Sequence, residues 1–269
     1  MKNIGDIKAL EEIKQRVSMH TSTTTNPLTV DLNMIQKTYE CEMCKDEEWI
    51  LILEFDEHGN KIKDFARQCE CKERKRIKRL MSSSKITNEF QQKTFKNFEQ
   101  KGRPKIVMQA FKNAYDYVIA FDEFRRTRRN SIALLGHPGC GKTHLLMAVA
   151  NSLLQKAVEV VYFPWVEGFN EIKNNLDKLE ERLDKLRRCE VLYIDDMFKG
   201  RREPTEFQLE QLFGIINYRY LENKPILISS EKNIGQMCEI DEGIGSRINE
   251  MCRDYRVTLT GGIELNYRL

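Results

Sequence analysis

The chain has 269 residues, of which 41% are hydrophobic and 32% are charged, and its formal net charge is +3. This length suits one large domain and a smaller one, and the hydrophobic fraction can fill a sizeable core. No apolar run approaches the roughly 20 residues that a membrane span needs, and the first residues lack the apolar core of a secretory signal. We therefore expect a cytoplasmic protein, and the small net charge does not by itself indicate nucleic-acid binding.

The first predicted element is a short amphipathic helix over residues 6–18. Its apolar side chains recur at helical spacing, at Ile7, Leu10, Ile13 and Val17. A polar run over residues 20–27 ends in proline and predicts a linker or loop. Residues 1–80 are interpreted as an N-terminal domain, although residues 1–40 carry no recognisable chemistry.

Four of the eight cysteines form two short pairs within residues 39–71: Cys41 with Cys44, and Cys69 with Cys71. Two predicted strands joined by a glycine-containing turn separate the pairs, so a hairpin would bring four thiols together. Four thiolates suit a tetrahedral, structural zinc site. Free buried thiols or a redox pair are the alternatives. His58 could replace one cysteine as a ligand, although a solvated histidine in a turn also fits its position.

The second domain is predicted over residues 94–269, after a basic helix over residues 71–80 and a linker over residues 81–93. Short apolar strands alternate with helices there, which predicts an α/β fold with a parallel sheet and helices on both faces. The strands are expected at 131–136, 158–163, 190–195, 225–230 and 255–260, and the helices near 104–124, 142–156, 166–187 and 205–222.

A complete P-loop motif follows the first strand of this domain. It reads Gly136, His137, Pro138, Gly139, Cys140, Gly141, Lys142, Thr143, with His144 next, and an amphipathic helix comes directly after it. Glycines let successive N–H groups turn toward phosphates, and the helix N-terminus adds its positive dipole end. Lys142 would neutralise the β- and γ-phosphates of ATP, and Thr143 would ligate magnesium. The alternative is a glycine turn that binds no ligand.

Two carboxylates end another apolar strand, about 50 residues further along the chain. Asp195 is expected to hold magnesium through water, and Asp196 to orient or deprotonate the attacking water. Two solvated acids at a strand end are the alternative, which the upstream P-loop disfavours. Together the two motifs predict an ATPase that uses ATP and Mg²⁺.

Further segments resemble a known family. Residues 225–231 end a buried strand in Ser-Ser-Glu, residues 243–248 read GIGSRI, residues 93–99 read KTFKNFE, and the last five read LNYRL. Together they resemble the DnaC/DnaI-type helicase loaders of bacteria and phages, which belong to the AAA+ ATPases and are related to IstB-type transposition helpers. The resemblance spans roughly residues 90–269, and the cysteine module upstream also resembles the loader type.

The resemblance implies roles for two more residues. Ser230 would be the sensor 1 residue, and Arg247 the arginine finger that completes the ATP site of a neighbouring subunit, so self-association through the ATP site is expected. Many relatives end the sensor strand in Thr-Ser-Asn. This chain has Glu231 at the last position, and an ionised carboxylate cannot donate a hydrogen bond to the γ-phosphate.

The function that this resemblance implies is helicase loading in DNA replication. The N-terminal module would bind a hexameric DnaB-type replicative helicase, and ATP would control its delivery to single-stranded DNA. Basic clusters at 72–79, 125–129 and 199–202 could contact DNA phosphates, or could be ordinary solvated faces. The alternatives are an IstB-like ATPase helper of transposition, which the cysteine module disfavours, and a helicase-binding adaptor that does not hydrolyse ATP.

Overall fold

A computed structural model describes residues 39–200 and 203–269. The chain divides into two compact units between Lys75 and Arg76, and each is described by itself. The helix predicted over residues 6–18 and the linker predicted over 20–27 lie outside the described residues. None of the helices within the described ranges has the length and apolar character needed to cross a membrane.

The smaller unit contains the predicted hairpin. Strands β1 (Trp49–Phe55) and β2 (Lys61–Gln68) pair antiparallel, and the Asp56 carboxylate accepts N–H groups of the turn that joins them. The two cysteine pairs flank this hairpin, which is how segments 27 residues apart in sequence reach one another. Helix α2 (Cys71–Ser83) begins at the last of these cysteines.

The larger unit is built on five parallel strands, as the sequence predicts. They are β3 (Ile132–Gly136), β4 (Val160–Pro164), β5 (Val191–Met197), β6 (Ile226–Ser230) and β7 (Tyr255–Leu259). Their order across the sheet is β4-β5-β6-β3-β7, so β6 lies between the P-loop strand β3 and the acidic strand β5. The carboxyl ends of parallel strands share one edge of the sheet, where such folds place their ligands.

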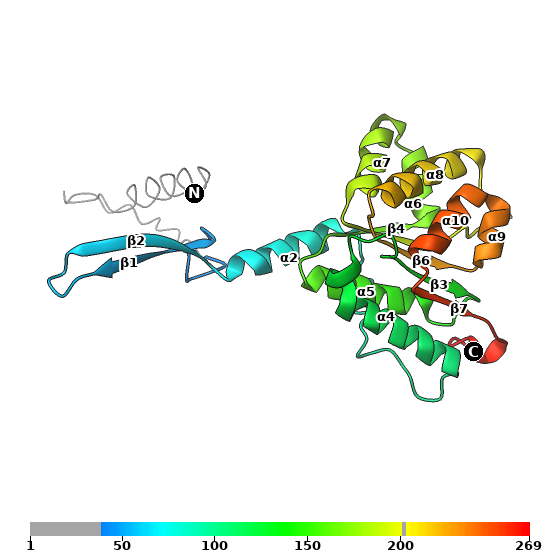
Figure 1. Cartoon of the computed structure of the whole chain (residues 1–269), viewed down its shortest axis with the longest axis horizontal. Coiled ribbons are helices and arrows are strands. Elements are labelled where there is room, and N and C mark those ends of the chain that lie inside the picture. Colours follow the sequence, from blue (N-terminus) through cyan, green and yellow to red (C-terminus); the bar gives the residue numbers. More distant parts are fainter. Residues whose placement is uncertain (1–38, 201–202) are drawn as a thin grey trace, which may run out of the picture. The chain divides into compact units, whose positions relative to one another are not determined.

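Helices cover both faces of this sheet and form two apolar cores (Figure 1). One face carries α4 (Lys105–Phe124) and α5 (Lys142–Gln155), with α3 (Asn88–Gln91) near them. The other carries α6 (Trp165–Lys173), α7 (Leu179–Arg188), α8 (Glu206–Leu221), α9 (Ile234–Ile240) and α10 (Glu242–Met251). Short 3₁₀ helices occur at Leu176–Lys178 and Ile263–Leu265. The predicted α/β fold is confirmed.

The single helix predicted over residues 166–187 is wrong, because the chain leaves the helix at Asn174 and Asn175 and begins again at Leu179. Asparagine side chains compete with helical backbone hydrogen bonds, so two in succession favour a break. The apolar spacing across the break misled the prediction: Leu183 is fully buried, whereas Leu176 is 59% exposed.

The segment predicted as a linker, residues 81–93, instead packs against the larger unit. Ser84 and Ile86 are buried, and the Ser84 carbonyl accepts the Tyr162 N–H on edge strand β4. The Asn151 amide of α5 donates to three carbonyls between Phe90 and Lys93. A run of serines predicts a loop, but the sequence does not show that its backbone groups are bonded to the fold.

Candidate nucleotide site and cysteine cluster

The P-loop links β3 to α5, and its three glycines, all with positive φ, make its curvature possible. Gly136 has φ +127°, and a Cβ there would lie 2.3 Å from the Leu259 carbonyl oxygen. Gly141 has φ +96° directly before the first residue of α5. Other residues rarely adopt these conformations, so the glycines allow the loop to lead directly into a helix whose N-terminus favours anions.

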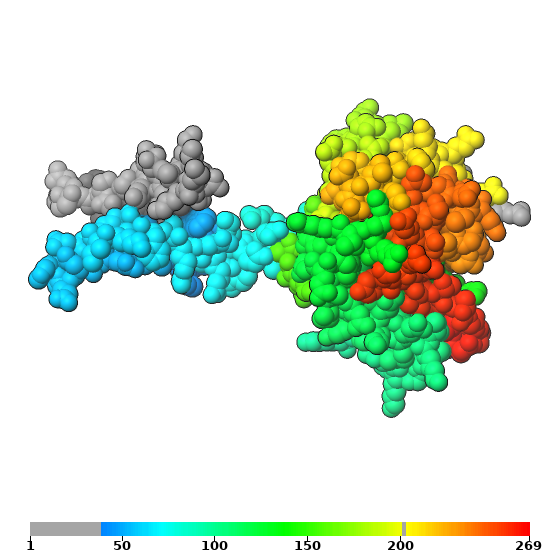
Figure 2. Space-filling view, in the orientation of Figure 1, coloured from blue at the N-terminus to red at the C-terminus, as the bar shows by residue number. Residues whose placement is uncertain are grey.

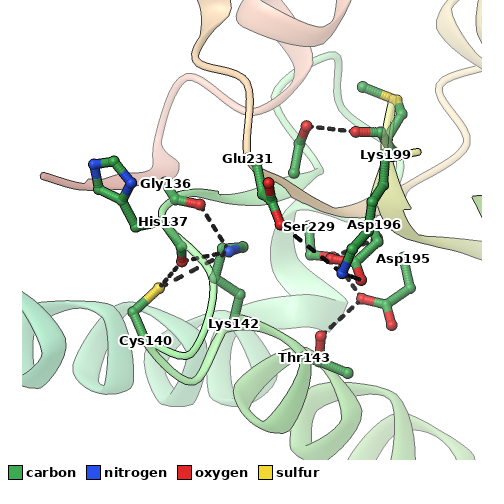
Figure 3. Close-up of polar contacts among 12 residues, drawn as sticks. Gly136, His137, Cys140, Lys142, Thr143, Asp195, Asp196, Lys199, Ser229 and Glu231 are labelled. Carbon is green, nitrogen blue, oxygen red and sulfur yellow. Dashed lines mark hydrogen bonds and ion pairs between the residues drawn. The ribbon is translucent and has the colours of Figure 1, made fainter. Parts of the chain in front are cut away.

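Lys142 is the first residue of α5 and extends along the loop. Its ammonium group donates to the carbonyl oxygens of Gly136 and His137, both at 2.8 Å (Figure 3). The Cys140 thiol also donates to the His137 carbonyl, at 2.9 Å. The lysine charge is therefore held at the mouth of the loop, where a phosphate chain would need it.

Asp195 is almost completely buried, and its carboxylate accepts hydrogen bonds from four hydroxyl groups. Thr143 donates to Oδ1 at 3.1 Å, Tyr193 donates to Oδ1 at 2.8 Å, and Ser229 also donates to Oδ1. Tyr162 donates to Oδ2 at 3.1 Å. Burial raises the pKa of both tyrosines, so they stay protonated donors. Thr143 and Asp195, the two residues expected to hold magnesium, are thus in contact, and hard oxygen donors suit that ion.

Asp196 lies where β5 leaves the sheet. Its φ is +52°, the pairing of β5 with β6 shifts at this point, and its N–H donates to Ser229 Oγ at 2.7 Å. A non-glycine residue in this conformation is held by its surroundings and is common at functional sites. Its carboxylate binds the Lys199 ammonium at 2.6 Å.

A pocket of about 510 Å³ joins these groups. The predicted residues that line it are Pro138, Gly139, Gly141, Lys142, Thr143, His144, Asp195 and Asp196. Gly136, His137 and Cys140 are not among the lining residues, since they turn the loop or bond to Lys142 instead. Segments named from the sequence also line it: Lys93, Asn97, Phe98 and Glu99 from residues 93–99, Lys199 from the basic cluster at 199–202, Glu231 from the sensor strand end, and Tyr267 and Arg268 from the last five residues. The lining residues that sequence reasoning did not single out are Glu89, Phe90 and Arg103.

Two segments far from the P-loop in sequence complete this pocket. Phe98 lies edge-on to His144 with ring centroids 5.1 Å apart. From the end of the chain, the Tyr267 N–H donates to the Gly139 carbonyl at 2.9 Å. Arg103 lies over the Tyr267 ring. In Figure 2 the C-terminal end of the chain, in red, lies at the surface beside the orange residues of α9 and α10.

The strand end at residues 229–231 differs from the simple sensor pattern. Ser230 is fully buried, and its hydroxyl donates to the Met197 carbonyl at 2.6 Å. Glu231, the next residue, lines the pocket, whereas Ser230 does not. Ser229 reaches Asp195, as described above. The structure thus turns Glu231 toward the nucleotide pocket and Ser230 away from it.

Arg247 is on α10, outside the pocket of its own chain. Its guanidinium donates to the Gly243 carbonyl at 2.8 Å and lies over the rings of Phe213 and Tyr220, 5.3 and 5.4 Å from their centroids. A finger that serves a neighbouring subunit need not contact its own nucleotide site. Its role stays a prediction.

Two of the predicted DNA-binding clusters are engaged within the chain. At 125–129, Arg125 pairs with Glu190, Arg128 donates to the Tyr220 carbonyl, and Arg129 lies 3.8 Å from Asp254. At 199–202, Lys199 binds Asp196, and residues 201–202 lie outside the described residues. Several of the basic side chains in these two clusters therefore already have partners within the chain.

The four cysteines converge in the smaller unit. Cys41 and Cys69 have sulfurs 3.7 Å apart, those of Cys44 and Cys71 are 3.3 Å apart, and all four lie within 4.8 Å of one another. Zn–S bonds of about 2.3 Å in a tetrahedron place sulfurs roughly 3.8 Å apart, so the group fits zinc. His58 is in the exposed turn of the hairpin and is not part of the group.

The thiols of this cluster have different proton affinities. Hydrogen bonding from the Cys44 backbone lowers the pKa of Cys41 to about 7, whereas burial raises the pKa of Cys71. A thiolate is the form that ligates metal, and the lowered pKa of Cys41 favours that form.

With the fold and pocket defined, comparison with known proteins identifies the family. Residues 91–252 match the bacterial DnaA ATPase domain. The chain belongs to this family. It is 49% identical to YqaM of Bacillus subtilis over 210 residues, 76% of this chain and 67% of that protein. It is 44% identical to XkdC of the phage-like element PBSX of Bacillus subtilis, over 86% of both chains.

A solved structure of the DnaC helicase loader has the same fold. It superimposes with a TM-score of 0.54 and 20% identity, covering 65% of this chain and all of that one. The AAA+ architecture and the resemblance to the DnaC/DnaI type are confirmed at the level of the fold. The family is therefore one of nucleotide-binding ATPase domains, and what this member does with ATP is considered next.

Proposed function

We propose that the chain binds ATP with magnesium and hydrolyses it. The observation that carries this proposal is the contact of Thr143 with the buried Asp195 beside Lys142, inside one pocket of about 510 Å³. Lys142 would bind the β- and γ-phosphates, and Thr143 and Asp195 would hold the ion, which supplies charge neutralisation. Asp196 would position the attacking water.

Replacement of Lys142 tests the nucleotide site. Lys142→Ala should weaken binding of an ATP analogue by at least about tenfold, because a charge-assisted contact to phosphate is lost. Lys112→Ala, an exposed position on α4, is the matched control and should bind as the wild type does. If both variants bind the ATP analogue with equal affinity, the assignment of Lys142 to a phosphate site is wrong.

We further propose that the chain is a loader of a hexameric, DnaB-type replicative helicase, which it delivers to single-stranded DNA in the cytoplasm. Support comes from the family, from the fold shared with the DnaC helicase loader, and from the four-cysteine module, which resembles the loader type. ATP bound between protomers would control assembly, and hydrolysis would release the helicase.

Co-purification with the replicative helicase of the same cell tests the loader proposal. We expect a complex that depends on residues 1–75 and survives Lys142→Ala in at least one nucleotide state. If no complex forms with or without ATP, the loader proposal fails. Binding to a transposase on duplex DNA would then favour the transposition helper.

A further inference from the structure

Three charged side chains, those of Lys199, Asp196 and Glu231, meet at one end of the pocket. The Lys199 ammonium donates to Asp196 Oδ2 at 2.6 Å and lies 3.8 Å from Glu231 Oε1 (Figure 3). Lys199, Asp196 and Glu231 all line the pocket that contains Lys142. Lys199 comes from the turn after β5 and Glu231 from the end of β6, so neighbouring strands bring them together.

The backbone around Lys199 is fixed, which distinguishes it from a freely solvated lysine. Its N–H donates to the Asp196 carbonyl at 3.0 Å, closing a tight turn. The residue before it, Phe198, is 5% exposed and packs against Trp165 with ring centroids 5.1 Å apart. The turn is anchored in the core through Phe198, and the side chains at its two ends, Asp196 and Lys199, reach the pocket.

Neither Ser230 nor Glu231 supplies this end of the pocket with the neutral donor expected of a sensor 1 residue. The Ser230 hydroxyl already donates to the Met197 carbonyl, and Glu231 offers only acceptors when ionised. With Asp196 and Glu231 unneutralised, the pocket would repel the terminal phosphate of ATP. An ammonium group has three donors, so Lys199 can stay paired with Glu231 and donate to a phosphate oxygen in place of Asp196.

We propose that Lys199 senses the terminal phosphate of ATP in place of a neutral sensor residue, with Glu231 holding its ammonium group at the pocket. This inference rests on the proposed ATP site. The hydrogen bond from Lys199 to Asp196 raises the lysine pKa, so the cation persists at neutral pH. The terminal phosphate competes with Asp196 for the same ammonium group, which frees the Asp196 carboxylate to orient water. ADP has no terminal phosphate there, so the Lys199–Asp196 pair persists with ADP.

The test compares affinities of the full chain for ADP and for a non-hydrolysable ATP analogue, both with magnesium. Lys199→Ala should weaken binding of the ATP analogue by roughly tenfold or more and leave ADP within about twofold. Lys199→Arg should keep the preference. Lys232→Ala removes the next charge along the chain from Glu231 without altering the pocket lining, and should behave as the wild type.

A second pair of variants separates sensing from a structural role. Glu231→Gln in the Lys199→Ala background should recover part of the lost ATP affinity, because the repelling carboxylate is gone. Equal losses for ATP and ADP, or an unchanged ratio, would overturn the inference. If Lys199→Ala does not fold, Lys199→Gln provides the same comparison. If the wild type binds neither nucleotide, the ATP site itself fails, which is a distinct result.

Discussion

His144, the residue after the P-loop threonine, connects the nucleotide pocket to residues 93–99. Its Nε2 lies 3.0 Å from the Thr94 carbonyl and 3.1 Å from Asn97 Oδ1, so this nitrogen carries a proton and donates. Burial lowers the pKa of His144 below its usual 6.5. The neutral ring is therefore the native form near neutral pH.

This pKa shift predicts a pH dependence of stability. Between the lowered folded pKa and the unfolded value of 6.5, the unfolded chain binds more protons, so the free energy of unfolding falls as pH drops below about 6.5. Above that pH the group contributes no slope. In thermal melts from pH 5 to 8, His144→Gln should flatten this fall. His58→Gln, at the exposed hairpin turn, should retain it, and equal slopes in all three proteins would contradict the assignment.

At the scale of helices and strands, Arg219 joins α8 to the beginnings of two strands. It is fully buried, and its guanidinium donates to backbone carbonyl oxygens, with no carboxylate partner among the residues that the structure describes. The acceptors are the carbonyls of Leu186, Arg187, Cys189, Glu190 and Pro225. One side chain therefore satisfies the end of α7 and the segments that lead into β5 and β6.

Removing this side chain should be strongly destabilising. Arg219→Met should lower the free energy of unfolding by at least about 3 kcal/mol, because several buried carbonyls lose their donors at once. Chemical denaturation of the full chain measures the change. Arg188→Met, whose side chain is 67% exposed, should alter it by less than about 0.5 kcal/mol. Similar midpoints for the two variants would show that water replaces the guanidinium.

The four-cysteine group makes a prediction for the smaller unit. The purified chain should contain about one zinc ion, and Cys41→Ser with Cys69→Ser should remove it and unfold the hairpin, since metal binding supplies folding energy to small units. Cys238→Ser, in the larger unit, is the control and should keep the metal. Atomic absorption measures the zinc content, and the rate of proteolysis within the hairpin measures its unfolding. Retention of zinc by the double variant would exclude these ligands.

Features formed by consecutive residues could be predicted from the sequence, whereas contacts between distant residues could not. The P-loop was predictable because its glycines, lysine and threonine are consecutive and their chemistry requires that order. Tyr162 and Arg103 could not be predicted in this way. Tyr162 reaches Asp195 only through the pairing of β4 with β5, and Arg103 reaches the pocket through contacts with residues far along the chain. Helices α9 and α10 were also missed. Asn233 and Gln236 form a capping box that could have revealed α9.

At the scale of the whole molecule, the placement of Arg247 predicts assembly. Arg247 does not line the pocket of its own chain, so an arginine finger at this position must act on a neighbour. Arg247→Ala and Lys142→Ala should each lower ATPase activity by at least about tenfold. Mixing them should restore part of it, because some interfaces pair an intact finger with an intact P-loop. Each variant measured alone, at the total protein concentration of the mixture, is the control. No recovery of ATPase activity on mixing would refute the intersubunit site.

The contact between Ser84 and strand β4 has a consequence for handling the protein. Strand β4 forms one edge of the sheet, and unpaired strand edges recruit other chains into aggregates. The Tyr162 N–H on that edge donates a hydrogen bond to the Ser84 carbonyl. The segment that contains Ser84 therefore covers part of the β4 edge. A fragment that starts after Ile86 would lose this shield and should precipitate, whereas one that starts at Arg76 should remain dispersed.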